Sequence, residues 1–112
     1  MKHTNYLEAE AKQNPHGADV KMLYNQDSAQ AVHISLEPGQ GLKPHITPVD
    51  VFFYILEGNP TILVGTETYV AQVNDLVESP KDIVHNITNH GDTKARILVV
   101  KAPRPAAAGL IL

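Results

Sequence analysis

From about Ala18 onward, apolar and polar residues alternate in short runs that end at turn-forming residues. Val32, Ile34 and Leu36 alternate with polar neighbours, and Pro38-Gly39 ends that run. A period of two is typical of a β-strand with one buried face. Similar runs recur at intervals of roughly ten residues, as in sandwiches and barrels. The pattern therefore predicts an all-β fold.

The individual strands can be placed from the same alternation and from the turns between them. The segment from Val51 to Glu57 is almost entirely apolar, as expected for a strand that is covered on both faces. Only Leu7 to Gln13 has a helical pattern. The expected strands are 32–36, 51–57, 61–64, 68–71, 76–78, 83–89 and 95–100.

Length and composition fit one domain over residues 1–112 and exclude several kinds of chemistry. The 112 residues carry a formal net charge of −3 and no cysteine. The absence of cysteine rules out disulfides, iron–sulfur clusters, thiol nucleophiles and cysteine zinc sites. The slightly acidic charge gives no electrostatic reason to expect a nucleic acid or an anionic membrane as partner.

The N-terminal residues are polar and contain no apolar stretch of signal-peptide length. No segment approaches the roughly 18 apolar residues of a membrane span. Together with the missing cysteines, this predicts a cytoplasmic protein with an N-terminal arm over residues 1–17 and a C-terminal tail over residues 104–112.

Two groups of residues carry a recognisable spacing. The first, at about 39–58, contains Pro38-Gly39, His45 and the run Tyr54-Ile55-Leu56-Glu57-Gly58. The second, at about 74–89, contains Asp75-Leu76, Pro80, His85 and Asn89. Their spacing resembles the two conserved motifs of the cupin family. The resemblance implies a small antiparallel jelly-roll barrel (a double-stranded β-helix), commonly dimeric, with a metal or small-molecule site in the barrel mouth.

The family's metal ligands are only half present. Its two motif-one histidines, its glutamate and its motif-two histidine fall on His45, Thr47, Val51 and His85. The resemblance therefore implies a possible site for one divalent transition metal (Zn, Fe, Mn or Ni) with an incomplete ligand set. Asp50 is the nearest carboxylate, but on a regular strand it faces away from His45 and could reach the site only through a bulge.

Two glycines of the second motif are also replaced, by Asn74 and Asp82. Asn and Asp tolerate positive φ angles better than other residues that are not glycine. Both replacements are therefore expected to keep the turns.

Strand alternation also predicts which side chains point inward. If His45 points into the barrel, Thr47 and Val51 do so too, and if His85 points inward so do Ile83 and Ile87. This set describes a mostly aliphatic cavity with two imidazoles and one hydroxyl, suited to a small organic ligand. The expected pocket residues are His45, Thr47, Val51, Phe53, His85, Ile87, Val32, Ile34 and Leu42.

The remaining candidates favour structural roles. His33 alternates onto the face opposite Val32 and is expected at the surface or in a dimer contact. His3, His16 and His90 carry no motif. Asn89 is expected to tie its turn through the side-chain amide. Phe52 and Tyr54 are expected to pack against a second sheet or a second subunit, which predicts a homodimer through this face or the C-terminal tail.

Three functions remain open from the sequence, and whether the chain is an enzyme is undecided. The first is a binding module that holds a small, largely apolar molecule, with His45, His85 and Thr47 as polar anchors. The second is a metal-dependent oxygenase or isomerase with His45 and His85 as ligands. The third is a metal-free enzyme with a histidine as general base.

Overall fold

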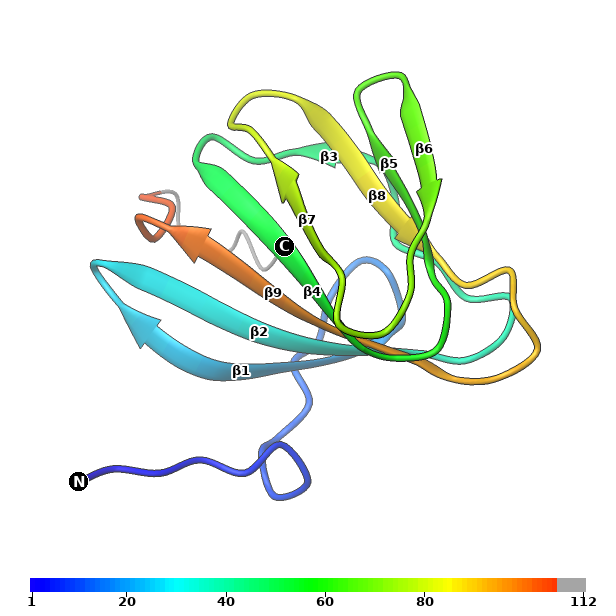
Figure 1. Cartoon of the computed structure of the whole chain (residues 1–112). Coiled ribbons are helices and arrows are strands. Elements are labelled where there is room, and N and C mark those ends of the chain that lie inside the picture. Colours follow the sequence, from blue (N-terminus) through cyan, green and yellow to red (C-terminus); the bar gives the residue numbers. More distant parts are fainter. Residues whose placement is uncertain (107–112) are drawn as a thin grey trace.

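The computed structural model describes residues 1–106 and contains two antiparallel sheets that face each other (Figure 1). The larger sheet has the order β1-β2-β9-β4-β7, and the smaller has the order β3-β8-β5-β6. The expected all-β jelly roll is therefore confirmed. Nine strands occur in this part of the chain: β1 Asp19–Gln26, β2 Ala29–Leu36, β3 His45–Ile46, β4 Asp50–Glu57, β5 Thr61–Val64, β6 Glu67–Val70, β7 Leu76–Ser79, β8 Val84–Thr88 and β9 Ala95–Ala102.

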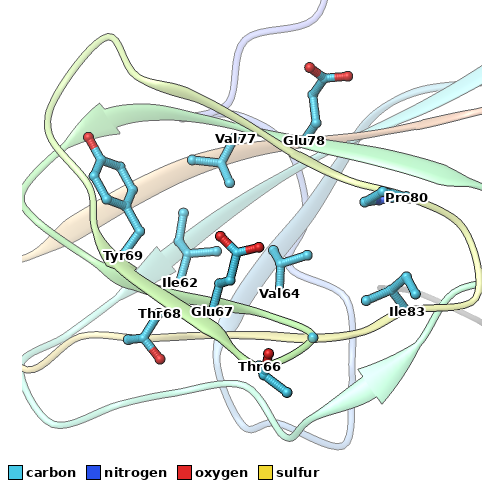
Figure 2. Close-up of a pocket in the computed structure, with 11 residues that line it drawn as sticks. Ile62, Val64, Thr66, Glu67, Thr68, Tyr69, Val77, Glu78, Pro80 and Ile83 are labelled. Atoms are coloured by element: carbon cyan, nitrogen blue, oxygen red, sulfur yellow. The ribbon is translucent and has the colours of Figure 1, made fainter.

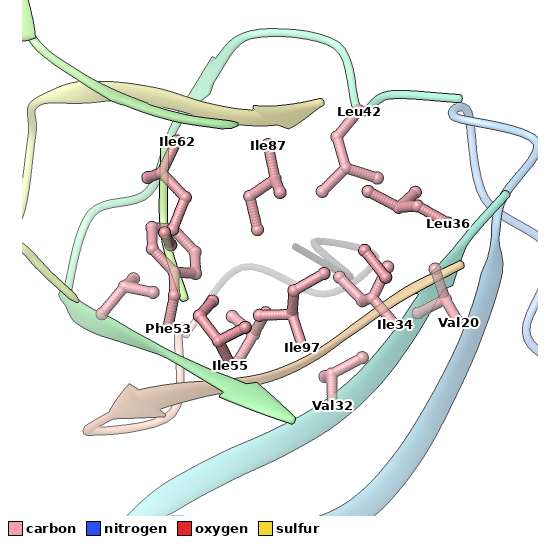
Figure 3. Packing of buried hydrophobic residues seen from close by; sticks show 14 residues of the cluster. Val20, Val32, Ile34, Leu36, Leu42, Phe53, Ile55, Ile62, Ile87 and Ile97 are labelled. Carbon is pink, nitrogen blue, oxygen red and sulfur yellow. The ribbon is translucent and has the colours of Figure 1, made fainter. Parts of the chain in front are cut away.

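The core lies between the sheets and is mainly aliphatic. Figure 3 shows Ile62, Ile87 and Leu42 on one side, pointing toward Phe53 and the inner residues of β2 and β9 on the other. The inner side chains of β2 are Val32, Ile34 and Leu36, as alternation predicts.

The turns confirm the roles expected for the two substituted glycine positions. Asn74 and Asp82 have φ angles of 76° and 64°. Asn89 is also structural, as expected. Its amide nitrogen donates to the carbonyl oxygens of Leu36 at 3.0 Å and Thr93 at 2.9 Å, and its oxygen accepts from the backbone N–H of Gly91 at 3.0 Å.

The expected helix over Leu7–Gln13 is wrong. A single turn forms, in which the N–H groups of Glu8 and Ala9 donate to the Asn5 carbonyl. The chain then forms an isolated bridge between Ala11 and Lys21 of β1. A helix this short gains too few hydrogen bonds to offset its nucleation cost, so pairing with β1 prevails.

His33 is the second correction. It does face away from the core, but it is only 2% exposed, because the ring of Tyr6 from the N-terminal arm lies 3.9 Å from it, centroid to centroid. Arg96 donates from Nε to His33 Nε2 at 3.1 Å and also lies over the Tyr6 ring. Burial and the Arg96 charge lower the pKa of His33 to about 4. The arm therefore covers a face that strand alternation alone predicts to be exposed.

Gly58 closes the first motif at a point where no side chain fits. Its φ is +77°, and an added Cβ would lie 2.5 Å from the Lys94 carbonyl oxygen. Gly39 has a similar φ of +87°, but a Cβ there would meet nothing within 4 Å. The two glycines share the backbone requirement and differ in steric space.

We therefore expect Gly58→Ala to destabilise the fold by about 3 kcal/mol or more, because a clash adds to the cost of a positive φ. Gly39→Ala should cost only about 1 kcal/mol, which is the cost of the backbone angle alone. Urea unfolding of both variants measures the difference. Equal losses of unfolding free energy in the two variants would show that the backbone around Gly58 moves to accommodate the added Cβ.

Candidate functional site

His85 lies at the centre of a polar cluster at one end of the barrel. It is the second residue of β8, where alternation with Ile87 directs it inward, and it is 2% exposed. The strand register places His45 of β3 directly opposite His85, so the two imidazoles of the two motifs meet as predicted. Ile83, expected on the same face, is instead 40% exposed, because the positive φ at Asp82 turns the chain and β8 begins only at Val84.

Both ring nitrogens of His85 have partners. Nδ1 lies 2.7 Å from the hydroxyl oxygen of Ser79, on β7 of the other sheet. Nε2 lies 3.2 Å from Nε2 of His45 and 3.3 Å from the hydroxyl oxygen of Thr47. Thr47 is itself buried. A buried imidazole with partners at both nitrogens can be accommodated without a large desolvation penalty.

The hydrogen-bond directions follow from one carbonyl. His45 Nδ1 lies 3.0 Å from the backbone oxygen of Lys43, and because a carbonyl oxygen only accepts, this nitrogen carries a proton. In neutral His45, Nε2 is then an acceptor, so His85 Nε2 must donate to it. His85 Nδ1 consequently accepts the hydroxyl proton of Ser79.

The environment keeps His85 neutral. Burial, followed by the charges of His45 and Lys101, lowers its pKa from 6.5 to about 4. At neutral pH this side chain is therefore a hydrogen-bonding group and carries no charge.

Three further polar residues complete this end of the barrel and were missed from the sequence. Gln30, Lys101 and Ser79 lie in one row across the inner face of the larger sheet, with Val51 between Lys101 and Ser79. All three are buried. Strand alternation could have identified them, because residues two positions apart on a strand point to the same face. Gln30 is two residues from Val32, Ser79 two from Val77 and Lys101 two from Val99.

His16 is a fourth residue of this end of the barrel that was missed from the sequence. Although it carries no motif, its ring centroid lies 5.7 Å from that of His45. Its Nδ1 accepts the backbone N–H of Lys43 at 2.8 Å, so this nitrogen carries no proton. The N-terminal arm thus contributes an imidazole to the outer side of the cluster.

Asp50 does not join the cluster. It is exposed at the start of β4, and its carboxylate accepts the backbone N–H of Lys81 at 3.0 Å. It therefore anchors the loop before β8 on the outside of the barrel.

The apolar residues expected to line a pocket belong to the hydrophobic core. They are buried together in one cluster, which includes Val32, Ile34, Leu42, Val51, Phe53 and Ile87. The edge of the Phe53 ring lies against His85, with centroids 5.2 Å apart. The polar cluster therefore rests on this core at the end of the barrel.

An open groove of about 720 Å³ lies elsewhere, between β5, β6 and β7. Figure 2 shows Val77 of β7 opposite Ile62 and Val64 of β5, with Tyr69 at one end and Ile83 at the other. None of the histidines of the polar cluster lines it, and its carboxylates, Glu67 and Glu78, are exposed. The groove separates edge strands of the two sheets and does not contain the buried chemistry.

Comparison with known proteins agrees with this geometry. Residues 32–101 match the cupin domain family. The chain belongs to the cupin family. None of the curated proteins compared with this cupin matches it.

Solved structures share the fold across almost the whole chain. The TT1209 protein from Thermus thermophilus is 27% identical, with a TM-score of 0.81, 94% of this chain covered and 100% of that one. A double-stranded β-helix cupin from Methanocaldococcus jannaschii is 26% identical, with a TM-score of 0.74 and coverage of 87% and 90%. An RmlC-like cupin from Shewanella frigidimarina, at 18% identity, a TM-score of 0.82 and coverage of 93% and 92%, supports the fold alone.

The residues of this cupin do not fit a resident metal ion. The 3.2 Å between His45 Nε2 and His85 Nε2 is close to the spacing of about 3.3 Å for two nitrogens on one tetrahedral ion. However, the described residues contain no group of three or more His, Cys, Asp or Glu able to hold a metal. His16 lies beside His45, but its Nδ1 is occupied by the Lys43 N–H and it does not form such a group with the pair. The other neighbours of the pair are the Thr47 and Ser79 hydroxyls, and the Lys101 amine is close enough to affect the pKa of His85. Neutral hydroxyls and an amine cation do not replace the missing carboxylate.

We therefore expect the purified protein, prepared without an affinity tag, to contain far less than one transition metal per chain after incubation with zinc, iron, manganese or nickel. The double variant Thr47→His/Val51→Glu supplies the two missing ligand types and should bind one ion per chain. Elemental analysis of both proteins is the measurement. One metal ion per chain in the unmodified protein would contradict the conclusion that these residues do not fit a resident metal.

Proposed function

We propose that this cupin is a binding module for a small, largely apolar molecule, with His45, His85 and Thr47 as the polar anchors. The observation that carries the proposal is the convergence of these three side chains, from both motifs, at one end of the barrel. His45 is partly exposed and His85 is buried, so the cluster extends from the surface to the core. Ligand sites commonly place a few polar groups on an apolar wall in this way.

Binding is favoured over catalysis by the state of His85. A general base works best when its pKa lies near the working pH. The pKa of His85 is about 4, which makes it a weak base at neutral pH and a suitable neutral donor or acceptor. A metal-dependent activity has only the histidine pair in its favour, and the same elemental analysis tests it.

The proposal predicts binding that depends on the cluster. A panel of small metabolites, screened by thermal shift and followed by isothermal titration, should yield binders whose affinity falls at least about tenfold, or about 1.4 kcal/mol, in His45→Ala and His85→Ala. His90→Ala is the matched control, because His90 is exposed in a turn. Binders with unchanged affinity in both cluster variants would place the ligand elsewhere and contradict the proposal.

A homodimer through the outer face of the larger sheet is a second part of the proposal. Phe52 pairs with Val100 and Tyr54 with Leu98 across β4 and β9, and all four side chains are only partly buried. Adjacent apolar side chains on an open sheet face are a common subunit contact. The alternative contact through the C-terminal tail involves residues 107–112, which lie outside the described residues.

Light scattering should therefore give about twice the 12.2 kDa chain mass. Leu98→Glu should produce a folded monomer, because the new carboxylate stays solvated in the monomer but would be buried without a partner in the dimer contact. Val70→Glu, at an exposed apolar position on β6 of the smaller sheet, should remain dimeric. A monomeric unmodified protein, or a dimer unaffected by Leu98→Glu, would contradict this contact.

A cytoplasmic location also remains part of the proposal, supported by the absence of cysteine. Among residues 1–106, the structure has no helix that is long and apolar enough to cross a membrane.

A further inference from the structure

Lys101 is a buried amine whose charge is balanced by no group within residues 1–106. Its side chain is 0% exposed on the inner face of β9, and Nζ has no hydrogen-bond partner in the described part of the chain. Burial lowers its pKa from 10.5 to about 8, so the amine is still mainly an ammonium at pH 7. The ion pairs found within residues 1–106 involve other groups: Lys94–Glu37, Arg96–Glu57 and Arg104–Asp27. An uncompensated buried ammonium is costly, and a bound anion would remove that cost.

The strand register places this amine inside the polar cluster. Lys101 pairs with Gln30 on one side and with Val51 on the other, and Val51 pairs with Ser79. Paired residues of antiparallel strands point to the same face, so Lys101 and Ser79 are separated by one strand. Ser79 donates to His85, and the Lys101 charge contributes to the lowered pKa of His85.

The cluster as a whole is suited to an anion. Its polar members are the imidazoles of His16, His45 and His85, two hydroxyls, the Lys101 amine and the Gln30 amide, and none is a carboxylate. The oxygen Oε1 of Gln30 is also buried without a partner among residues 1–106, but as an acceptor it does not contribute to anion binding. The apolar core surface formed by Phe53 and Val51 adjoins this polar end.

We propose that Lys101 binds the carboxylate of a small carboxylic acid whose apolar body rests on the core at this end of the barrel. The Nζ group donates charge-assisted hydrogen bonds to the carboxylate, which are stronger than those to a neutral oxygen. This inference rests on the proposed function and names its ligand class. It adds Lys101 to His45, His85 and Thr47 as the residue that selects the charge of the ligand.

Three probes of one size and different charge test the proposal: hexanoate, hexanamide and hexylammonium. Titrations are followed by NMR on the full chain at pH 7, in the unmodified protein and in Lys101→Met. Methionine retains the length of the buried side chain and removes its charge. Lys81→Met is the matched control, since Lys81 is exposed in the loop before β8.

We expect hexanoate to bind the unmodified protein at least about tenfold more tightly than the other two probes. In Lys101→Met, hexanoate affinity should fall at least tenfold, while hexanamide affinity should stay within about twofold. Lys81→Met should change neither. Equal affinity for hexanoate in the unmodified protein and Lys101→Met, or no binding of hexanoate at all, would overturn the inference.

The titrations also separate this inference from the proposed function. If His85→Ala abolishes hexanoate binding and Lys101→Met does not, the site stands and the role of Lys101 fails. If Lys101→Met alone abolishes binding, the anchoring role of the histidines fails instead. Should Lys101→Met not fold, the ε-methylene signals of Lys101 in the unmodified protein decide: they should shift with hexanoate and not with hexanamide, and the reverse would contradict the proposal.

Discussion

The hydrogen bond between Ser79 and His85 is the contact on which the polar end of this barrel depends. It joins β7 of the larger sheet to β8 of the smaller one at 2.7 Å, and it occupies the inner nitrogen of a buried imidazole. The outer nitrogen then faces His45 and Thr47. One side chain therefore links the two sheets and also defines which atoms a ligand can meet.

A neutral His85 explains why this end of the barrel can combine burial with polarity. A charged imidazole in the same place would face the Lys101 ammonium and would lose its solvation. With His85 neutral, Lys101 carries the buried charge alone. In the cupin pattern the position of Val51 is that of a carboxylate ligand, and here Val51 pairs with Lys101 in the strand register. This end of the barrel thus has valine where the cupin pattern has a cation-binding group, and an ammonium lies on the paired position.

The architecture was largely predictable because it depends on local signals. Alternation located β2 and the strands from β4 to β9, but not β1 or the two-residue β3. The tolerance of Asn and Asp for positive φ correctly identified the turns at Asn74 and Asp82. The spacing of the motifs also brought His45 and His85 together. The helix expected at Leu7–Gln13 failed because pairing with β1 outweighs the weak local preference of so short a segment.

The site was only partly predictable because its remaining members depend on contacts that are distant in sequence. His33 is buried by Tyr6 and His16 lies beside His45, and no periodicity within a strand reports how the N-terminal arm packs. Lys101 and Ser79 stand at positions that alternation directs inward, but a polar residue at a strand end is normally interpreted as solvent-exposed. Only the register across β9, β4 and β7 shows that both face the interior.

The state of the His85 ring is the central claim, and ¹⁵N NMR of the histidine side chains measures it directly. The structure predicts that at neutral pH His85 is uncharged and that it titrates near pH 4. While His45 is also neutral, the His85 proton is on Nε2 and none is on Nδ1. Exposed His90 provides the reference signal in the same spectra. Titration of His85 near pH 6.5, or a proton on Nδ1 in its neutral form, would contradict the account.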